Sequence, residues 1–315
     1  MIWLTWRQHR GELFGAAAVL IVLGALVLAH GIPMHHRYDQ DGIAACQVME
    51  PPAYVGPAVA GADGVDERCA RALESFRASY EALPLQVAAW LPFFPAVVGI
   101  MVGAPLLGRE FEQGTWQLAW TQGVTKRQWV RRRFALVFAG VLLVSLAVAA
   151  IVSWWFEPLA PHAFTPEKFN HGLLVFPAYV LFACALGAVN GTLIRRTIPA
   201  AAVTLASFLA VRVPVEFAAR AHYRTPLTTT DPGQAQGWMV SDGYTGLANR
   251  VVPTDVVITY HPADRFWQFQ LIEASIFIGL AAILVLVTYR VLVGTRTTPQ
   301  RSAAQLPHPA LTASP

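Results

Sequence analysis

Charged residues are scarce in this sequence. Only 13% of its 315 residues are Asp, Glu, Lys or Arg, whereas 55% are hydrophobic, and the mean hydropathy is +0.45. An ordinary soluble domain carries about 25% charged residues. The composition therefore excludes that class and favours a protein whose main solvent is the lipid bilayer.

Lysine is especially rare, and the motifs of common catalytic sites are missing. The chain has two lysines, Lys126 and Lys168, and neither lies in the G-x-x-x-x-G-K-[ST] loop that binds nucleotide phosphates. No H-E-x-x-H, G-x-S-x-G or C-x-x-C sequence occurs. His35 and His36 are adjacent in a polar stretch, where solvation explains them better than metal ligation. We therefore expect no catalytic, cofactor or metal site on this chain, and no ATP-binding site of its own.

Cysteine is scarce too, with three residues in the chain. Cys46 and Cys69 lie in one polar segment with 22 residues between them, a spacing that matches no zinc site. In an oxidising compartment the two would form a disulfide, and two unrelated thiols are the alternative. Cys184 lies in an apolar run, where a small apolar side chain is explanation enough.

Six apolar runs are long enough, or nearly so, to cross a membrane as helices. A hydrocarbon core about 30 Å thick needs about 20 helical residues. The predicted spans are 13–30, 83–107, 134–156, 171–194, 197–217 and 269–293. The first run resembles a signal peptide, but "GIPMHHRYDQ" after it offers no cleavage site, so we expect it to be retained. The sequence thus predicts an all-α membrane protein with six transmembrane helices in a single domain, 1–315.

Lysine and arginine are concentrated in alternate connecting segments. One set holds 12 in 62 residues, and the other holds 9 in 117. The basic-rich set is 1–12, 108–133, 195–196 and 294–315, and the other set is 31–82, 157–170 and 218–268. Since basic residues favour the cytoplasmic side, we expect a plasma-membrane protein with both termini in the cytoplasm. Segments 31–82 and 218–268 would then be extracytoplasmic, and 294–315 a flexible cytoplasmic tail. The net charge of +4 follows from this topology and does not indicate nucleic-acid binding.

Three charged residues lie in or beside the predicted spans. Arg212 and Glu216 are four residues apart, so on a helix they share a face, and pairing would lower the cost of placing them in a membrane. Glu216 follows Arg196 by 20 residues, or about 30 Å of helix, which places it near the outer interface. Glu273 lies near the outer start of the last span. These charges either line a translocation path or, more simply, anchor the helices at the outer interface.

Small residues and prolines mark two of the spans. G-x-x-x-G motifs begin at Gly99 and Gly187, and such motifs let helix backbones approach closely in a membrane. The partner helix could belong to the same chain or to a second one. Pro92, Pro95 and Pro105 remove backbone donors from the second span and should kink it.

The densest charge lies in "GREFEQGTWQLAWTQGVTKRQWVRRR", residues 108–133, between the second and third spans. We expect Gly108 to end the second span. A short surface helix after it would place Glu112, Trp116 and Trp120 along one stripe, with indole rings suited to headgroups or to a protein pocket. The plain alternative is a positive-inside loop with interfacial tryptophans.

The end of this connector carries a helix start signal. Thr125 followed by Gln128 forms a capping box, and Val124 and Trp129 occupy the positions of a hydrophobic staple. The helix of the third span should therefore begin near Lys126. Basic residues in the first turn oppose the helix dipole by about 0.3–1 kcal/mol each. Attraction to anionic lipid, roughly 1 kcal/mol per basic group, offsets that cost.

The connector resembles the coupling helix of permease subunits of ATP-binding-cassette (ABC) transporters of the type-two export class. In that family an acidic "E-x-E-x-G-T" segment, followed by a threonine-bearing turn and basic residues, docks on the ATPase. The residues to which the resemblance assigns ATPase coupling are Glu110, Glu112, Gly114, Thr115, Trp116, Trp120, Thr125, Lys126 and Arg127. The two tryptophans stand where aliphatic residues are commoner, and they resemble a subgroup with "W-T-Q" at this place.

The N-terminus "MIWLTWRQHR" fits the same resemblance. Ile2, Trp3 and Trp6 can face lipid while Arg7 and Arg10 face water, as in an interfacial helix before the first span. The family has such a helix. A flanking aromatic and basic anchor without further function is the alternative.

The resemblance implies a permease half that forms a translocation path for export. It also implies two protein partners, a separate cytoplasmic ATPase and a second permease chain in a homodimer or heterodimer, besides membrane lipid. Two other classes remain open from the residues alone. A secondary transporter or channel would use Arg212, Glu216 or Glu273 as coupling charges. A membrane-anchored sensor or binding protein would use the outer segments.

Overall fold

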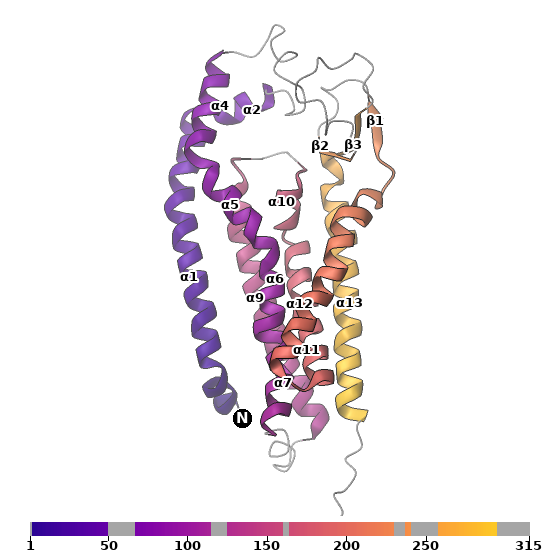
Figure 1. Ribbon diagram of the computed structural model, residues 1–315. Coiled ribbons are helices and arrows are strands. Elements are labelled where there is room, and N and C mark those ends of the chain that lie inside the picture. Colours follow the sequence, from indigo (N-terminus) through magenta and orange to yellow (C-terminus); the bar gives the residue numbers. More distant parts are fainter. Residues whose placement is uncertain are drawn as a thin grey trace, which may run out of the picture.

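The computed structural model of the protein describes residues 2–49, 67–114, 125–159, 164–229, 237–240 and 258–294. They form an elongated helical bundle with a small sheet at one end (Figure 1). The α-helices are α1 (Ile2–Gln40), α2 (Ile43–Met49), α4 (Glu67–Tyr80), α5 (Ala82–Trp90), α6 (Phe94–Val98), α7 (Ala104–Gln113), α9 (Lys126–Phe156), α10 (Pro166–Asn170), α11 (Val175–Ile194), α12 (Thr197–Pro214) and α13 (Phe266–Gly294). The 3-10 turns are η1 (Leu91–Phe93), η4 (Arg220–His222) and η6 (Ala263–Arg265), and the π-helical turns are η2 (Gly99–Gly103) and η3 (Val215–Ala219). The strands are β1 (Leu227–Thr229), β2 (Gly237–Met239) and β3 (Ile258–Pro262).

The two ends of the bundle differ in what they carry (Figure 1). The N-terminus, the last turn of α7, the first turn of α9 and the last turn of α13 lie at one end, which we call the connector end. Helices α2 and α4 and the three strands lie at the opposite end, which we call the loop end. The long helices run between the two.

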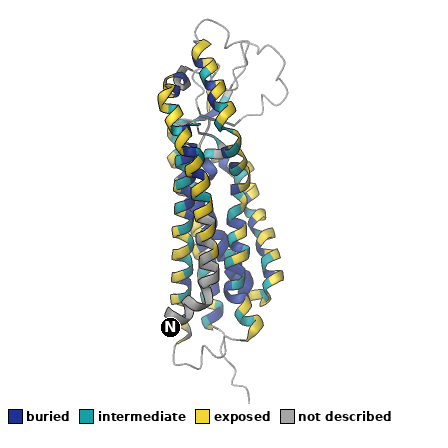
Figure 2. Ribbon diagram, turned by 90° about the vertical axis from the view of Figure 1, so that its left-hand side faces the viewer, coloured by how far each residue is buried: buried dark blue, intermediate teal, exposed yellow. Residues whose placement is uncertain are grey.

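Helix α11 lies at the centre of the bundle. Most of its residues are buried, and it packs against α7 with η2, against α9, against α12 and against α13. Its sequence is apolar around nearly the whole helix, which is the pattern of a helix surrounded by others. The surrounding helices instead expose part of their surface, as the exposed residues along their outer faces show (Figure 2).

Five described helical stretches are long and apolar enough to cross a membrane: Ala82–Gln113, Arg127–Phe156, Val175–Ile194, Thr197–His222 and Ala263–Gly294. Their outward faces carry large apolar side chains, such as Leu143 at 67% exposure and Ile283 at 58%. Such a surface is unfavourable in water and favourable in lipid. The prediction of a helical multi-pass membrane protein is therefore confirmed.

The first predicted span, 13–30, lies within α1, a single helix from Ile2 to Gln40. Most side chains before residue 21 lie outside the described part of the chain, so the sixth span stays a prediction. Residues 2–12 continue into the rest of α1 without a break, and a distinct interfacial helix at the N-terminus also stays a prediction. The tail predicted at 294–315 lies outside the described residues after Gly294.

The second span is assembled from short helical pieces. It runs through α5, η1, α6, η2 and α7, and the helix type changes at each junction. Prolines stand at the first or second position of η1, α6 and α7, where a missing N–H is tolerated. Regular α-helix is thus interrupted near Pro92, Pro95 and Pro105 by 3-10 and π-helical turns, and the predicted kink itself stays a prediction.

The two G-x-x-x-G motifs pack against each other within one chain. A Cβ atom at Gly187 would lie 2.4 Å from the carbonyl oxygen of Gly99, and one at Gly103 would lie 2.5 Å from that of Cys184. At Gly191 the nearest atom would be the carbonyl oxygen of Ala104, again at 2.4 Å. No side chain fits at these distances, so glycine is required for α11 to approach the second span. The predicted close packing is confirmed, and the partner helix belongs to the same chain.

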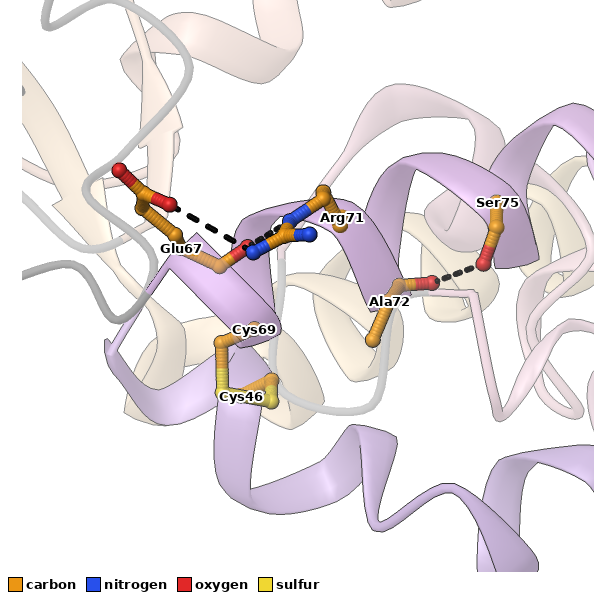
Figure 3. The surroundings of a disulfide bond; sticks show 6 residues. All are labelled: Cys46, Glu67, Cys69, Arg71, Ala72 and Ser75. Carbon is orange, nitrogen blue, oxygen red and sulfur yellow. Dashed lines mark hydrogen bonds and ion pairs between the residues drawn. A yellow bond between two sulfur atoms is a disulfide. The ribbon is translucent and has the colours of Figure 1, made fainter.

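The loop end contains a disulfide and a sheet. Cys46 of α2 and Cys69 of α4 are joined by a disulfide with a Cα–Cα distance of 5.1 Å (Figure 3). Beside it, Arg71 and Glu67 form an exposed ion pair on α4 (Figure 3). The strands form an antiparallel sheet in the order β1-β3-β2, with Leu227 opposite Tyr260. The all-α prediction missed this sheet because strands of three to five residues are too short to show an alternating pattern.

Candidate functional site

The connector begins with the last turn of α7, which continues through Gly108 and ends at Gln113. The expectation that Gly108 ends the span was wrong. Its backbone is helical, and a Cβ atom there would make ordinary van der Waals contacts with Thr197 at 3.6 Å and Gly191 at 3.7 Å. The helix stops at Gly114 instead, whose φ of 68° lies in the left-handed region that favours glycine.

Glu112 binds the first residue of α12. Its carboxylate accepts hydrogen bonds from the backbone N–H of Thr197 at 3.1 Å and from the Thr197 hydroxyl at 2.8 Å. The N-cap residue of α12, Arg196, makes no side-chain capping bond of its own. An acidic side chain favours the partial positive charge of a helix N-terminus. Glu112 therefore caps α12 from a different helix, 85 residues earlier in the chain.

Glu110 binds the first turns of α9. It forms an ion pair with Arg133, and both side chains are largely buried. The Arg133 guanidinium also lies 5.3 Å from the centre of the Trp129 ring, a cation–π distance. The two acidic residues of the connector thus hold α7 to both α9 and α12. The helix predicted to carry Glu112, Trp116 and Trp120 along one stripe does not start at Glu112, because this residue belongs to the last turn of α7.

The remaining connector residues are described only in part. Thr115, Trp116 and Trp120 lie outside the described residues, which resume at Thr125. Thr125 is the N-cap of α9, and its hydroxyl accepts a hydrogen bond from the N–H of Gln128 at 3.3 Å, so the predicted N-cap and the helix start at Lys126 are confirmed. The predicted hydrophobic staple stays a prediction, because Val124 lies outside the described residues. The Lys126 side chain is not described, and Arg127 is exposed.

The turn between α11 and α12 adjoins the connector. Arg195 ends α11 with a φ of 59°, the one left-handed backbone among the described non-glycine residues, and this lets α12 begin two residues later. Its guanidinium lies 5.4 Å from the ring centre of Phe111 in α7. A shallow depression of about 620 Å³ opens here, lined by Glu112, Arg195, Arg196, Ile198 and Pro199. Glu112 of the connector and this turn therefore line one depression of the surface.

A second polar site lies at the far end of α12, where charged side chains meet inside the bundle. Glu273 of α13 is fully buried and binds Arg220 in two places, through Nε at 2.9 Å and through Nη2 at 2.9 Å. The hydroxyl of Tyr179 in α11 donates to the same carboxylate, and the hydroxyl of Tyr223 donates to it at 3.1 Å. Burial, followed by the Glu273 charge, raises the pKa of Tyr223, so this hydroxyl keeps its proton and stays a donor.

Asn170 of α10 joins a second ion pair to this group. Its carbonyl oxygen accepts from Arg212 at 2.8 Å and from Arg220 at 2.9 Å, and its N–H donates to Glu216 at 2.7 Å. Arg212 lies 3.2 Å from Glu216 and stacks on Tyr179, with 4.2 Å between its Cζ and the ring centre. We call the set Asn170, Tyr179, Arg212, Glu216, Arg220, Tyr223 and Glu273 the ionic network.

The ionic network balances two positive charges with two negative ones. Removing charges from water is costly, and the cost is recovered only where geometry is good and further hydrogen bonds are made. Arg212 and Glu273 are 4% and 0% exposed, which does not fit an interfacial anchor, whose charged end would lie in water. The sequence placed Arg212 and Glu216 on one helix face, and the structure pairs them and adds Glu273 from another helix.

Four members of the network were missed by sequence reasoning: Asn170, Tyr179, Arg220 and Tyr223. Arg220 carried a usable signal, because Arg212, Glu216 and Arg220 recur at intervals of four residues on one helical face. Asn170 and Tyr179 carried none, since only the packing of α10 and α11 brings them to the charges. Among the described residues, no group of three or more His, Cys, Asp or Glu side chains is arranged to hold a metal ion.

Comparison with known proteins identifies a protein family that matches this chain. Residues 17–220 match the family described as ABC-2 membrane transporter related, a stretch that runs from α1 to Arg220 and includes the connector. Searches of curated proteins and of solved structures found no match. The matched stretch covers well over half of the chain and agrees with the resemblance carried by the connector. This chain therefore belongs to the ABC-2 membrane transporter related family.

Proposed function

We propose that this chain is the permease half of an ABC exporter and that its connector couples it to a separate cytoplasmic ATPase. The observation that carries the proposal is the attachment of the connector to two further spans. Glu110 binds Arg133 of α9, and Glu112 binds Thr197 of α12. A force applied to the connector therefore acts on three spans at once. A loop that served only as a positive-inside signal would need neither contact.

The ATPase would act on this chain through its change of shape. Closure of an ATPase dimer around ATP would shift the connector and thereby repack the spans that it joins. A ligand shifts such an equilibrium only by its difference in affinity for the two states. The permease accordingly needs no ATP site, and the export direction rests on the family alone.

The surface at the connector end fits a protein partner. Glu112 of the connector and the α11–α12 turn line one depression, and Ile198 beside them is 83% exposed. A partner that contacted both would cover this apolar side chain and meet the basic residues Arg195 and Arg196. The bias of lysine and arginine toward the same end supports a cytoplasmic location for it. A second permease chain would complete the transporter, as a homodimer or a heterodimer in the plasma membrane.

Co-purification tests this function. The chain is expressed with the ABC-type ATPase encoded nearest to its own gene, as wild type and as the charge reversal Glu112→Lys. We expect the wild type to retain the ATPase and Glu112→Lys to lose it, with both chains inserted in the membrane at similar yield. Glu74→Lys, a charge reversal of an exposed residue on α4 at the loop end, is the matched control and should retain the ATPase. If Glu112→Lys retains the ATPase and full ATP hydrolysis, the coupling role is wrong, and the connector is better explained as a positive-inside loop.

A further inference from the structure

Helix α12 is held by polar contacts at both of its ends. At its first residue, Thr197 is bound by Glu112 of the connector. In its last turn, Arg212 is bound by Asn170 and lies 3.2 Å from Glu216 in the ionic network. The helix therefore joins the connector end of the bundle directly to the loop end.

Between these contacts α12 is regular. It is an α-helix of 18 residues, which corresponds to about 27 Å at about 1.5 Å per residue. It packs against α7, η2 and α11, and in its middle Asn190 of α11 donates to the Thr204 hydroxyl at 3.2 Å. A helix supported in this way moves as a unit, so a shift of Thr197 is carried to Arg212.

The backbone changes from α-helix to other helical turns where α12 reaches the ionic network. Pro214 ends the helix, and the π-helical turn η3 and the 3-10 turn η4 follow it. These two turns carry Glu216 and Arg220. Proline and π-helical turns are the places at which helices bend, so this segment can change shape while α12 stays intact.

The ionic network offers alternative pairings at little distance. Arg220 lies 2.9 Å from Glu273 and 3.8 Å from Glu216, while Arg212 lies 3.2 Å from Glu216 and 3.8 Å from Glu273. Each arginine is thus within 4 Å of both carboxylates. A small shift of η3 would exchange the partners and leave no buried charge uncompensated, which is the costly outcome.

From these contacts we infer that α12 transmits movement of the connector to the ionic network, with Thr197 as the positioning residue at the point of attachment. The inference rests on the proposed function, since it takes the connector to be moved by an ATPase. It assigns the network a role that a static anchor would lack. The four charges form the element that changes partners when the connector moves, because they combine alternative pairings with a backbone that can bend.

Hydrogen–deuterium exchange of the permease–ATPase complex in lipid nanodiscs tests this transmission. Exchange is measured with and without a non-hydrolysable ATP analogue, in peptides that cover 104–113 and 209–223. We expect wild type to show a nucleotide-dependent difference in both peptides. Thr197→Val and Glu112→Ala should lose the difference in 209–223. Thr197→Val should keep the difference in 104–113 and should still bind the ATPase, which a general loss of folding would not allow.

Thr192→Val is the matched control for Thr197→Val. Thr192 also lies near the connector end, but its hydroxyl is buried and donates only to Ala188 in its own helix, so its loss should leave both differences intact. A wild type that responds in 104–113 but not in 209–223 would overturn the transmission and leave the proposed function standing. Equal losses in Thr192→Val and Thr197→Val would overturn it as well. Failure of the wild type to bind the ATPase would overturn both proposals.

Discussion

At the connector end, Glu112 is exposed and binds a single residue of α12, whereas at the loop end Glu273 is fully buried and binds two arginines and two tyrosines. The first contact is exposed at the surface, where a partner protein can reach the Glu112 carboxylate. The second lies where each charge depends on its partners. The connector end is therefore suited to reversible binding of a partner, and the loop end to holding one packing or switching to another of similar energy.

The largest loss of stability is expected when a buried charge of the ionic network is removed. Glu273→Leu would leave Arg212 and Arg220 with one carboxylate between them, and the loss of one partner of a buried pair costs about 3–5 kcal/mol. We expect a large drop in membrane yield and in the thermal unfolding temperature in detergent. The double variant Arg220→Met with Glu273→Leu restores the charge balance and should recover much of the loss. A Glu273→Leu protein as stable as wild type would show that the ionic network does not contribute to the stability of the fold.

A smaller effect is expected from pH, through a histidine at the loop end. Burial lowers the pKa of His171 to about 4, and its Nε2 has no hydrogen-bond partner. In the unfolded chain the pKa is about 6.5, so between about pH 6.5 and 4 the unfolded state binds the proton and the folded state does not. The stability is thus complete above about pH 6.5 and falls as the pH drops toward 4, by up to about 3 kcal/mol.

The pH effect is measured by thermal unfolding in detergent between pH 7 and pH 4.5. His171→Gln removes the titrating group and should flatten the decline relative to wild type. Other buried histidines add to the slope in both proteins, so the difference between the two curves isolates His171. An unchanged slope in His171→Gln would contradict the burial of a neutral imidazole at this position.

A still smaller loss of stability is expected from a change in the contact between α11 and the second span, which both run between the connector end and the loop end. Gly187→Ala would place a Cβ atom 2.4 Å from the Gly99 carbonyl oxygen, so the helices must separate, at a cost of about 1–3 kcal/mol. Gly279→Ala on α13 is the control, because its Cβ atom would meet nothing within 4 Å. We expect a lower unfolding temperature for Gly187→Ala only. Equal temperatures for both variants would contradict the close helix contact.

The features that the sequence predicted are those encoded by neighbouring residues. The cap at Thr125 depends on a residue only three positions later in the chain. The glycine motifs and the Arg212–Glu216 spacing depend on helical periodicity. The cysteine pair could be anticipated because both residues lie in one polar segment. Each of these can be judged within about seven residues or from composition.

The features that the sequence did not predict depend on contacts between distant elements. Glu112 caps a helix that begins 85 residues later, and this contact also explains why α7 continues past Gly108. Asn170 reaches the arginines only because α10 packs beside α12 and α11. A local pattern contains no information on such pairs, and a short polar segment such as the sheet at β1 carries too few residues for a periodic signal.

The central claim, that the connector receives an ATPase, is tested most directly by site-specific photo-cross-linking in cells. A photoreactive amino acid is placed at Gln113, exposed at the end of α7, or at Ser75, exposed on α4 at the opposite end. The chain is expressed with the ABC-type ATPase encoded nearest to its gene and irradiated. We predict a covalent adduct with the ATPase from Gln113 and none from Ser75. An adduct from Ser75, or no adduct from Gln113 while the two proteins co-purify, would contradict the claim.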